Sequence, residues 1–399
     1  MNDERAPRAP GEPARPPDRE FALWRLGFRP FYLVASIFAA ASVPLWALQY
    51  AGYLPHPYLS ASVFHAHEMI FGFAAAVVTG FLFTAVRNWT SLTTPSGWLL
   101  GGIVALWVLG RGLVLTPWTS ISVIVNTVFL LSAAAGIGVP IVKSRNRRNY
   151  FFVVALVFLA TAELGFGLSV LNVISFPAWL SARLGLDIIL FLVAVMAGRV
   201  VPMFTNNGVR GANARRHPWV ERASLGAILA LLAADATQLT GPVVNTLLVV
   251  AALLHLARLL MWQPWKTVHT PLVWVLHLAY AWIPVHFILR CLADAERVVP
   301  FLATHALTIG VIGTMTLGMM TRTALGHTGR TLIAGTVELW CYLLVTAAAI
   351  TRVFMPMLEP SAYRETVLLS AVFWSAAYGL YAVGYWPILT RARVDGKPG

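Results

Sequence analysis

Six histidines lie in stretches of sequence that are otherwise apolar. They are His65, His67, His255, His277, His286 and His305. Neutral imidazole is a ligand of haem iron and of copper. An ionisable side chain inside a membrane span also marks a functional site, because its burial in hydrocarbon is costly. We therefore treat all six as candidate metal ligands. The competing interpretation is that they form hydrogen bonds that hold neighbouring helices together.

Two of these histidines occur in the segment SVFHAHEMIFGF, next to a glutamate. On a helix that turns about 100° per residue, His65 and His67 point about 200° apart, so one metal ion cannot bind both. We expect one of them to face a metal or a haem in the bundle interior and the other to bond a neighbouring helix; the spacing does not decide which. Glu68 and Met69 should lie on the His65 side, where the carboxylate would orient an imidazole of a neighbouring helix.

The depth of each histidine in its span separates the six into two groups. His65, His67, His286 and His305 fall near the outer ends of their spans, whereas His255 and His277 fall in inner halves. His277 and His286 are about 13 Å apart along one helix and roughly 180° apart around it, so they cannot serve one centre. We expect an outer haem held by one of His65 or His67 together with His305. His277 then belongs to a separate inner site, either copper with His255 or a hydrogen bond between helices.

Charged residues occur in the same apolar spans and have two interpretations each. Arg111, Arg183 and Arg290 lie near outer ends, where guanidinium groups either hold haem propionates or extend to the interface. Glu163, Asp187, Asp235 and Glu338 either form a proton path or pair with arginines for packing.

The elements that would carry these residues are transmembrane helices. Hydrophobic residues make up 58% of the 399 residues and charged residues 11%, and the mean hydropathy is +0.72. Apolar runs long enough to cross a hydrocarbon core of about 30 Å recur about twelve times. We therefore predict an all-α, polytopic membrane protein. The expected spans are 31–51, 62–86, 97–115, 119–141, 150–172, 182–204, 221–238, 241–262, 272–292, 298–320, 331–354 and 364–389.

Most of the 29 Lys and Arg residues fall on the side of the membrane that carries the N-terminus, which predicts that both termini are cytoplasmic. We expect residues 1–24 to be a disordered cytoplasmic tail, 25–390 a single transmembrane domain and 391–399 a second cytoplasmic tail. The net charge of +13 is then a topology signal and a means of contact with the lipid bilayer, and we expect no nucleic acid partner.

Several long strings in this sequence are specific enough to suggest a family. GFRPFYLVASIFAA, FHAHEMIFGFAAAVVTGFLFTAVRNWT, GRVVPMFTNN, PLVWVLHLAYAWIP and HALTIGVIGTMTLGMMTRTALGHTGR resemble the NnrS family, bacterial membrane proteins associated with nitric oxide stress and denitrification. The resemblance implies an inner-membrane protein of about twelve helices that carries haem and copper. The matching positions are His65, His67, Glu68, Arg111, Arg199, Asn206, Asn207, His277, His305, Arg322 and His327. Where family members often carry a histidine in the fifth span, this chain has Glu163.

The leading hypothesis for function is a haem protein of the bacterial inner membrane that binds or reacts with nitric oxide and protects the cell from nitrosative stress. If it turns nitric oxide over, it is an oxidoreductase. One alternative is a proton-coupled secondary transporter, although residues 25–204 and 221–389 show no convincing inverted repeat. Another is a membrane scaffold or sensor without metal chemistry.

The topology can be tested with a cysteine at position 147. In a chain whose native Cys291 and Cys341 are replaced by serine, Arg147→Cys should be protected from an impermeant thiol reagent added to intact spheroplasts, because the loop is expected inside. Arg297→Cys, on the expected outer side, should react. Labelling at position 147 without labelling at 297 would reverse the orientation.

Overall fold

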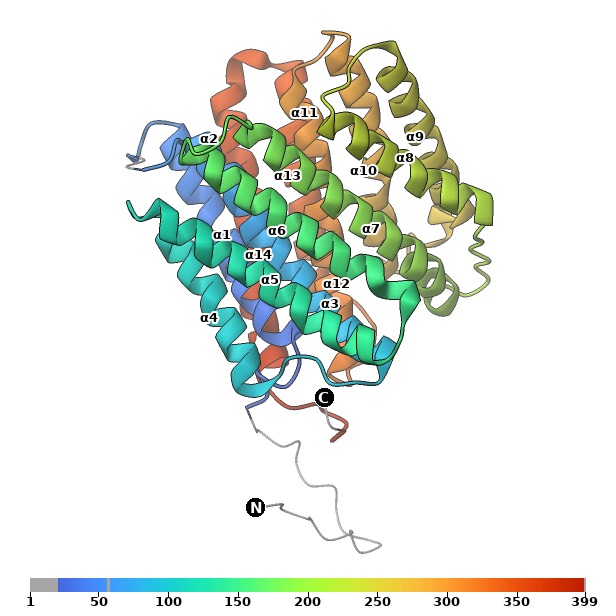
Figure 1. Ribbon diagram of the computed structural model, residues 1–399. Coiled ribbons are helices and arrows are strands. Elements are labelled where there is room, and N and C mark those ends of the chain that lie inside the picture. Colours follow the sequence, from blue (N-terminus) through green and yellow to red (C-terminus); the bar gives the residue numbers. More distant parts are fainter. Residues whose placement is uncertain (1–20, 56–57, 398–399) are drawn as a thin grey trace, which may run out of the picture.

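The computed structural model describes residues 21–55 and 58–397, so the expected N-terminal tail lies, up to residue 20, outside the described residues. Within the described part of the chain, the helices form twelve rods (Figure 1). They are α1 (Phe28–Tyr50), α2 with α3 (Ala61–His67, Ala75–Thr90), α4 (Gly97–Leu113), α5 (Thr119–Lys143), α6 (Tyr150–Val170), α7 (Ala178–Gly208), α8 (Pro218–Ala236), α9 (Pro242–Met261), α10 (Pro271–Asp294), α11 with α12 (Pro300–His305, Thr314–His327), α13 (Thr336–Leu358) and α14 (Tyr363–Thr390).

The prediction of an all-α polytopic membrane protein is confirmed. Ten of the rods in the described chain are long and apolar enough to cross a membrane. Of the other two, α4 has 17 residues and α8 includes Glu221, Arg222 and Asp235. Each expected span has its rod, but the ends differ. For example, the rod expected at 298–320 continues to His327, because Gly329, with its positive φ of 75°, is the first residue to turn the chain away.

The first and the last helix pack side by side, so the two halves of the chain form one bundle (Figure 1). α14 lies between α1 and α13. Arg29 in α1 is fully buried, and its Nη1 donates to the carbonyl oxygens of Leu389 (3.0 Å) and Arg391 (2.7 Å) at the end of α14. These are carbonyls that a helix end leaves without partners. The arginine of GFRPF therefore fixes the end of α14, and both described chain ends lie on the same side of the bundle.

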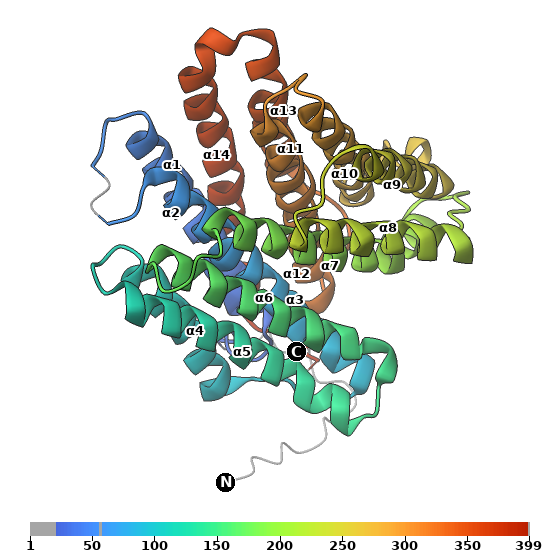
Figure 2. The same ribbon diagram turned by 45° about the horizontal axis from the view of Figure 1, so that its top comes forward.

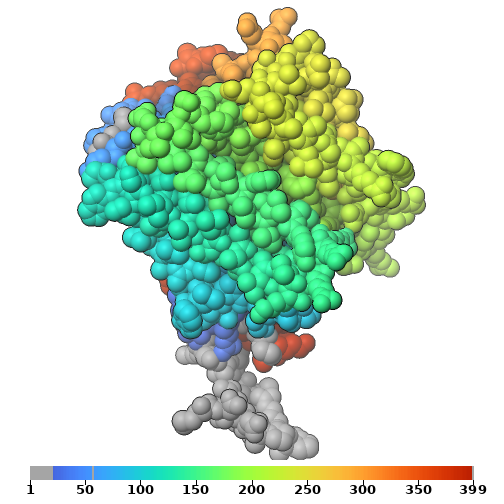
Figure 3. Space-filling model, viewed as in Figure 1, coloured from blue at the N-terminus to red at the C-terminus, as the bar shows by residue number. Residues whose placement is uncertain are grey.

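The face shown in Figure 3 is covered by the helices from α4 to α9, packed side by side. Many of their outward side chains are large and apolar, such as Leu109, Ile124, Phe158 and Leu253. Figure 2 shows α7 and α8 crossing the bundle beside the more upright α13 and α14. An outer surface of this kind suits contact with lipid chains rather than with water.

Two of the rods contain a π-helical segment, Glu68–Ala74 between α2 and α3 and Ala306–Gly313 between α11 and α12. A π-turn leaves backbone carbonyls poorly paired, and hydrocarbon offers them no water. Side chains of neighbouring helices take over: Trp107 Nε1 donates to Gly72 O (3.0 Å), and the Tyr378 hydroxyl donates to Gly313 O (2.9 Å). Such segments are frequent at functional sites, and both begin within three residues of a candidate histidine.

Close packing around Arg258 explains why position 198, the first residue of the string GRVVPMF, is glycine. The Arg258 side chain in α9 is fully buried and donates from Nη2 to Glu221 (2.7 Å) and from Nη1 to Ala194 O (3.0 Å). A Cβ at position 198 would lie 1.8 Å from Arg258 Nη2, so only glycine lets α7 approach this guanidinium.

Gly198→Ala should therefore lower stability by about 1–3 kcal/mol, the usual cost of overpacking a core. The measurement is the midpoint of thermal unfolding of the purified protein in detergent. Gly226→Ala is the matched control, because a Cβ at that helical position in α8 meets nothing within 4 Å. Equal midpoints for the two variants would contradict the packing argument.

Candidate functional site

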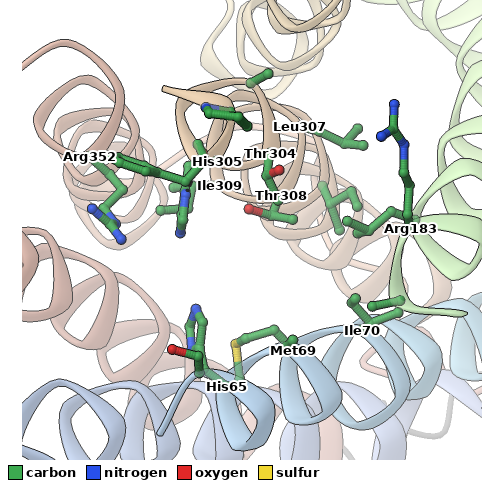
Figure 4. Close-up of a pocket in the computed structure, with 18 of the residues that line it drawn as sticks. His65, Met69, Ile70, Arg183, Thr304, His305, Leu307, Thr308, Ile309 and Arg352 are labelled. Atoms are coloured by element: carbon green, nitrogen blue, oxygen red, sulfur yellow. Dashed lines mark hydrogen bonds between the residues drawn. The ribbon is translucent and has the colours of Figure 1, made fainter. Parts of the chain in front are cut away.

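A cavity of about 600 Å³ lies between the two rods that contain π-helical segments. One wall is formed by α2 and the segment after it, with His65, Met69 and Ile70, and the opposite wall by α11 and its continuation, with His305 and Thr308 (Figure 4). α7, α10, α13 and α14 close the sides. A volume of this size is typical of a site for a small molecule or a cofactor. His65 and His305, which were expected to share one site, both line this cavity.

His65 and His305 face one another across this cavity (Figure 4). Their ring centroids are 6.5 Å apart and their planes differ by 16°. Trp46 covers the face of the His65 ring at 3.8 Å between centroids. His305 Nδ1 donates to the carbonyl oxygen of Phe301 (2.7 Å), so its Nε2 has a free lone pair. Fixing the second ring nitrogen in this way is what proteins do to an imidazole that binds a metal.

The spacing of the two rings suits a single metal between them. Two imidazoles that each bind one ion at about 2.0 Å place their ring centroids roughly 6.3 Å apart when they bind from opposite sides. Across the described residues, no group of three His, Cys, Asp or Glu side chains is arranged so that it could hold a metal ion. A metal held between these two imidazoles would therefore take its remaining ligands from a cofactor such as a porphyrin.

His67 points away from the cavity into a buried network of charges. Its Nδ1 lies 2.7 Å from Glu68 Oε1 and its Nε2 lies 2.9 Å from Glu163 Oε1. Glu68 Oε1 also accepts from Arg111 Nη1 at 2.6 Å, and Arg111 bonds Asn126. With both glutamates ionised, His67 would donate from both nitrogens as an imidazolium, and two positive and two negative charges would balance in this network.

The network changes the expected roles of Glu68 and Arg111. We expected Glu68 on the His65 side, but the π-helical segment begins at Glu68, and its carboxylate bonds His67 and Arg111 instead. Arg111, expected as a holder of haem propionates, does not line the cavity. Glu163, which stands where family members often carry a histidine, is the residue that binds His67 from α6.

The other three histidines differ in how available they are to a metal. His286 lines the cavity, with Nδ1 bonded to Ala303 O (2.7 Å) and Nε2 buried without a partner. His277 lies elsewhere, 2.8 Å from the Thr205 hydroxyl through Nε2. His255 has both nitrogens in hydrogen bonds, with Tyr280 and with Ser224 O. The expected copper pair of His255 and His277 would thus require the hydrogen bonds of His255 to break.

Sequence reasoning missed residues that complete the cavity beside the histidine pair. Arg352 in α13 is buried; its Nη2 donates to the Tyr363 hydroxyl (2.8 Å), while its Nη1 has no hydrogen-bond partner in the described structure. Trp46 and Tyr363 also line this end. Their spacing in the sequence carries no signal, since the three residues come from α1, α13 and α14. Of the residues that line this part of the cavity, only Met69 could have been placed beside His65 from the sequence, because it lies four residues further along the same helix.

The cavity opens at the end of the bundle away from the described chain ends. The residues at the opening include the exposed Ser62 and Asp294 and Trp179, which is 57% exposed. If the chain ends are cytoplasmic, as the basic residues indicate, this opening faces the outside of the cell.

A comparison with known protein families shows which family the chain belongs to. The model of the NnrS protein family matches residues 22–393, which include every helix and both walls of the cavity. The chain belongs to the NnrS family. No curated protein sequence matches it. Within this NnrS chain, the strings that suggested the family contain the facing pair His65 and His305 and, of the His67 network, His67 and Glu68.

The His67 network predicts a large effect of Arg111 on stability. Arg111→Ala should destabilise the protein by about 3 kcal/mol or more, because it leaves Glu68 buried without its guanidinium partner. Denaturant titration of the purified protein in detergent measures this. Arg147→Ala, which removes an exposed arginine, is the control. A stable Arg111→Ala protein with an altered cavity ligand would instead favour the role first expected for Arg111.

Proposed function

We propose that the cavity holds a haem between His65 and His305, and that the protein binds or reacts with nitric oxide there and so protects a bacterial cell from nitrosative stress. The observation that carries the proposal is the facing pair of imidazoles, 6.5 Å apart between ring centroids, on opposite walls of a cavity of about 600 Å³. Membership of the NnrS family supports the same conclusion.

The residues around the pair fit the rest of a haem. Met69, Ile70, Phe73, Ile312 and Trp374 give the cavity apolar walls suited to a porphyrin ring. Haem also carries two propionates, which need cationic partners. Arg352 beside His305 has a buried Nη1 without a partner and no carboxylate bound to it in the described chain, so it can take a propionate.

Nitric oxide suits this location for physical reasons. It is a small uncharged molecule that dissolves in hydrocarbon, and the protein is a multi-pass membrane protein, so the gas reaches the cavity through lipid as well as through the opening. A bound haem would supply an iron atom at which nitric oxide binds. The inner membrane of a bacterium is the location that we propose, in keeping with the family.

Copper has weaker support than haem in this chain. No cluster of three suitable side chains is present in the described residues, and both nitrogens of His255 are in hydrogen bonds. We therefore assign no step to copper.

The optical spectrum of the purified protein tests the proposal. We expect a Soret band in the wild type, and its loss or shift in His65→Ala and in His305→Ala, because an axial imidazole sets the spin state of the iron. His277→Ala is the matched control, since this buried histidine does not line the cavity. Nitric oxide added to the reduced wild type should shift the band.

Three outcomes would contradict the proposal. One is a wild type without haem, and another is an unchanged spectrum in both His65→Ala and His305→Ala. The third is loss of haem from His277→Ala alone, which would move the centre to the other site. Survival of cells challenged with a nitric oxide donor should follow the spectra of the variants.

A further inference from the structure

A second set of charged groups borders the cavity at the end away from Arg352. Arg183 and Asp187 reach it from α7, one helical turn apart, and His286 and Arg290 reach it from α10. In Figure 4 Arg183 lies on the opposite side of the cavity from Arg352. The proposed haem ligands do not include any of these groups, yet they line the same space.

The two arginines at this end of the cavity, Arg183 and Arg290, are both paired with one aspartate, Asp235. Asp235 in α8 is buried; its Oδ1 accepts a hydrogen bond from Arg290 Nη2 at 2.9 Å and forms an ion pair with Arg183 Nη2 at 2.8 Å. An oxygen paired with two guanidinium groups belongs to an ionised carboxylate. Asp235 therefore holds both arginines in place.

Asp187 has no such partner, although it is 4% exposed and lies on the cavity. Its Oδ2 is buried without a hydrogen-bond partner, and in the described structure neither Arg183 nor Arg290 forms an ion pair with it, as both do with Asp235. An ionised carboxylate buried without a partner is costly, and a protonated one is not. Asp187 is therefore the carboxyl group of this cluster that holds a proton.

The proton sets the net charge of the cluster formed by Arg183, Arg290, Asp187 and Asp235. With both aspartates ionised, the two arginines balance them and the cluster is neutral; with one proton bound, the cluster carries one positive charge. The cluster can thus offset one negative charge that appears elsewhere in the cavity, where low polarity makes an unbalanced charge costly. His286 also faces this end, and its free Nε2 can accept a hydrogen bond from a water or from Asp187.

A route for protons to this cluster begins at the cavity opening. The Arg183 side chain is 39% exposed, and Asp294 at the opening is exposed. The exposed Thr304 lies between the opening and Thr308 on the same wall. Water at the opening can thus reach Asp187 along this polar side of the cavity, without passing the apolar walls formed by residues such as Phe73 and Trp374.

We propose that the Asp187–Asp235 pair is the proton-loading site of this cavity, with Asp187 as the residue that gains and loses the proton. The inference rests on the proposed haem. With a haem bound, one-electron reduction by an external donor would add one negative charge to the cavity, and the pair would take one proton from water at the opening and leave hydroxide in solution. Oxidation would reverse both transfers.

Proton uptake on reduction tests the inference directly. Purified protein in weakly buffered detergent solution is reduced by dithionite in an anaerobic cuvette, and a pH indicator reports the protons taken up per haem, after correction for those that dithionite releases. Asp187→Asn should keep the Soret band and lose at least half of the uptake of the wild type. Asp187→Glu should restore the uptake. Glu338→Gln, a buried carboxylate that does not line the cavity, should match the wild type.

The outcomes separate this inference from the haem proposal. Haem-loaded Asp187→Asn with unchanged uptake overturns the inference alone, whereas a wild type without haem overturns both. A second measurement needs no variant: the redox-induced infrared difference spectrum of the wild type should show a protonated carboxyl band on reduction. Absence of that band overturns the inference even where Asp187→Asn does not fold.

Discussion

In the apolar interior of a membrane, a polar side chain must find its partner within the protein, and this constraint orders the bundle. Three buried arginines show how. Arg29 binds carbonyl oxygens at the end of α14, Arg111 binds Glu68, and Arg258 binds Glu221. Each joins different segments of the bundle, from the consecutive helices α8 and α9 to the first and last helices, and Arg258 also requires glycine at position 198.

The same constraint makes the exceptions informative. Buried polar atoms without partners include His65 Nδ1, Asp187 Oδ2, His286 Nε2 and Arg352 Nη1, and all four side chains line the large cavity. In the network around His67 both ring nitrogens lie within hydrogen-bonding distance of a glutamate, although Glu68 Oε2, Glu163 Oε2 and Arg111 Nε have no partner. The two sites therefore differ at their histidines: His65 and His286 on the cavity each keep a ring nitrogen without a partner, and His67 does not.

The two π-helical segments connect the fold with the cavity. Each lies in a rod that carries one histidine of the facing pair, and each is stabilised from outside, by Trp107 in one case and by Tyr378 in the other. Glu68 pairs with the adjacent His67 and with Arg111, whereas Met69 lies on the cavity beside His65. Helical spacing thus placed Met69 on the His65 side, as the structure has it, but did not show that Glu68 is held by a charge on another helix.

The sequence by itself determined that the protein is all-α and polytopic, because apolar runs of membrane length impose helices, and its specific strings determined the family. Helical periodicity also showed that His65 and His67 point to different sides. Only the tertiary structure decided that His65 faces His305, that Glu163 holds His67, and that Arg352 and Trp46 complete the cavity. Those contacts join different helices that are far apart in the sequence, and neither hydropathy nor spacing along one helix specifies which helix packs against which.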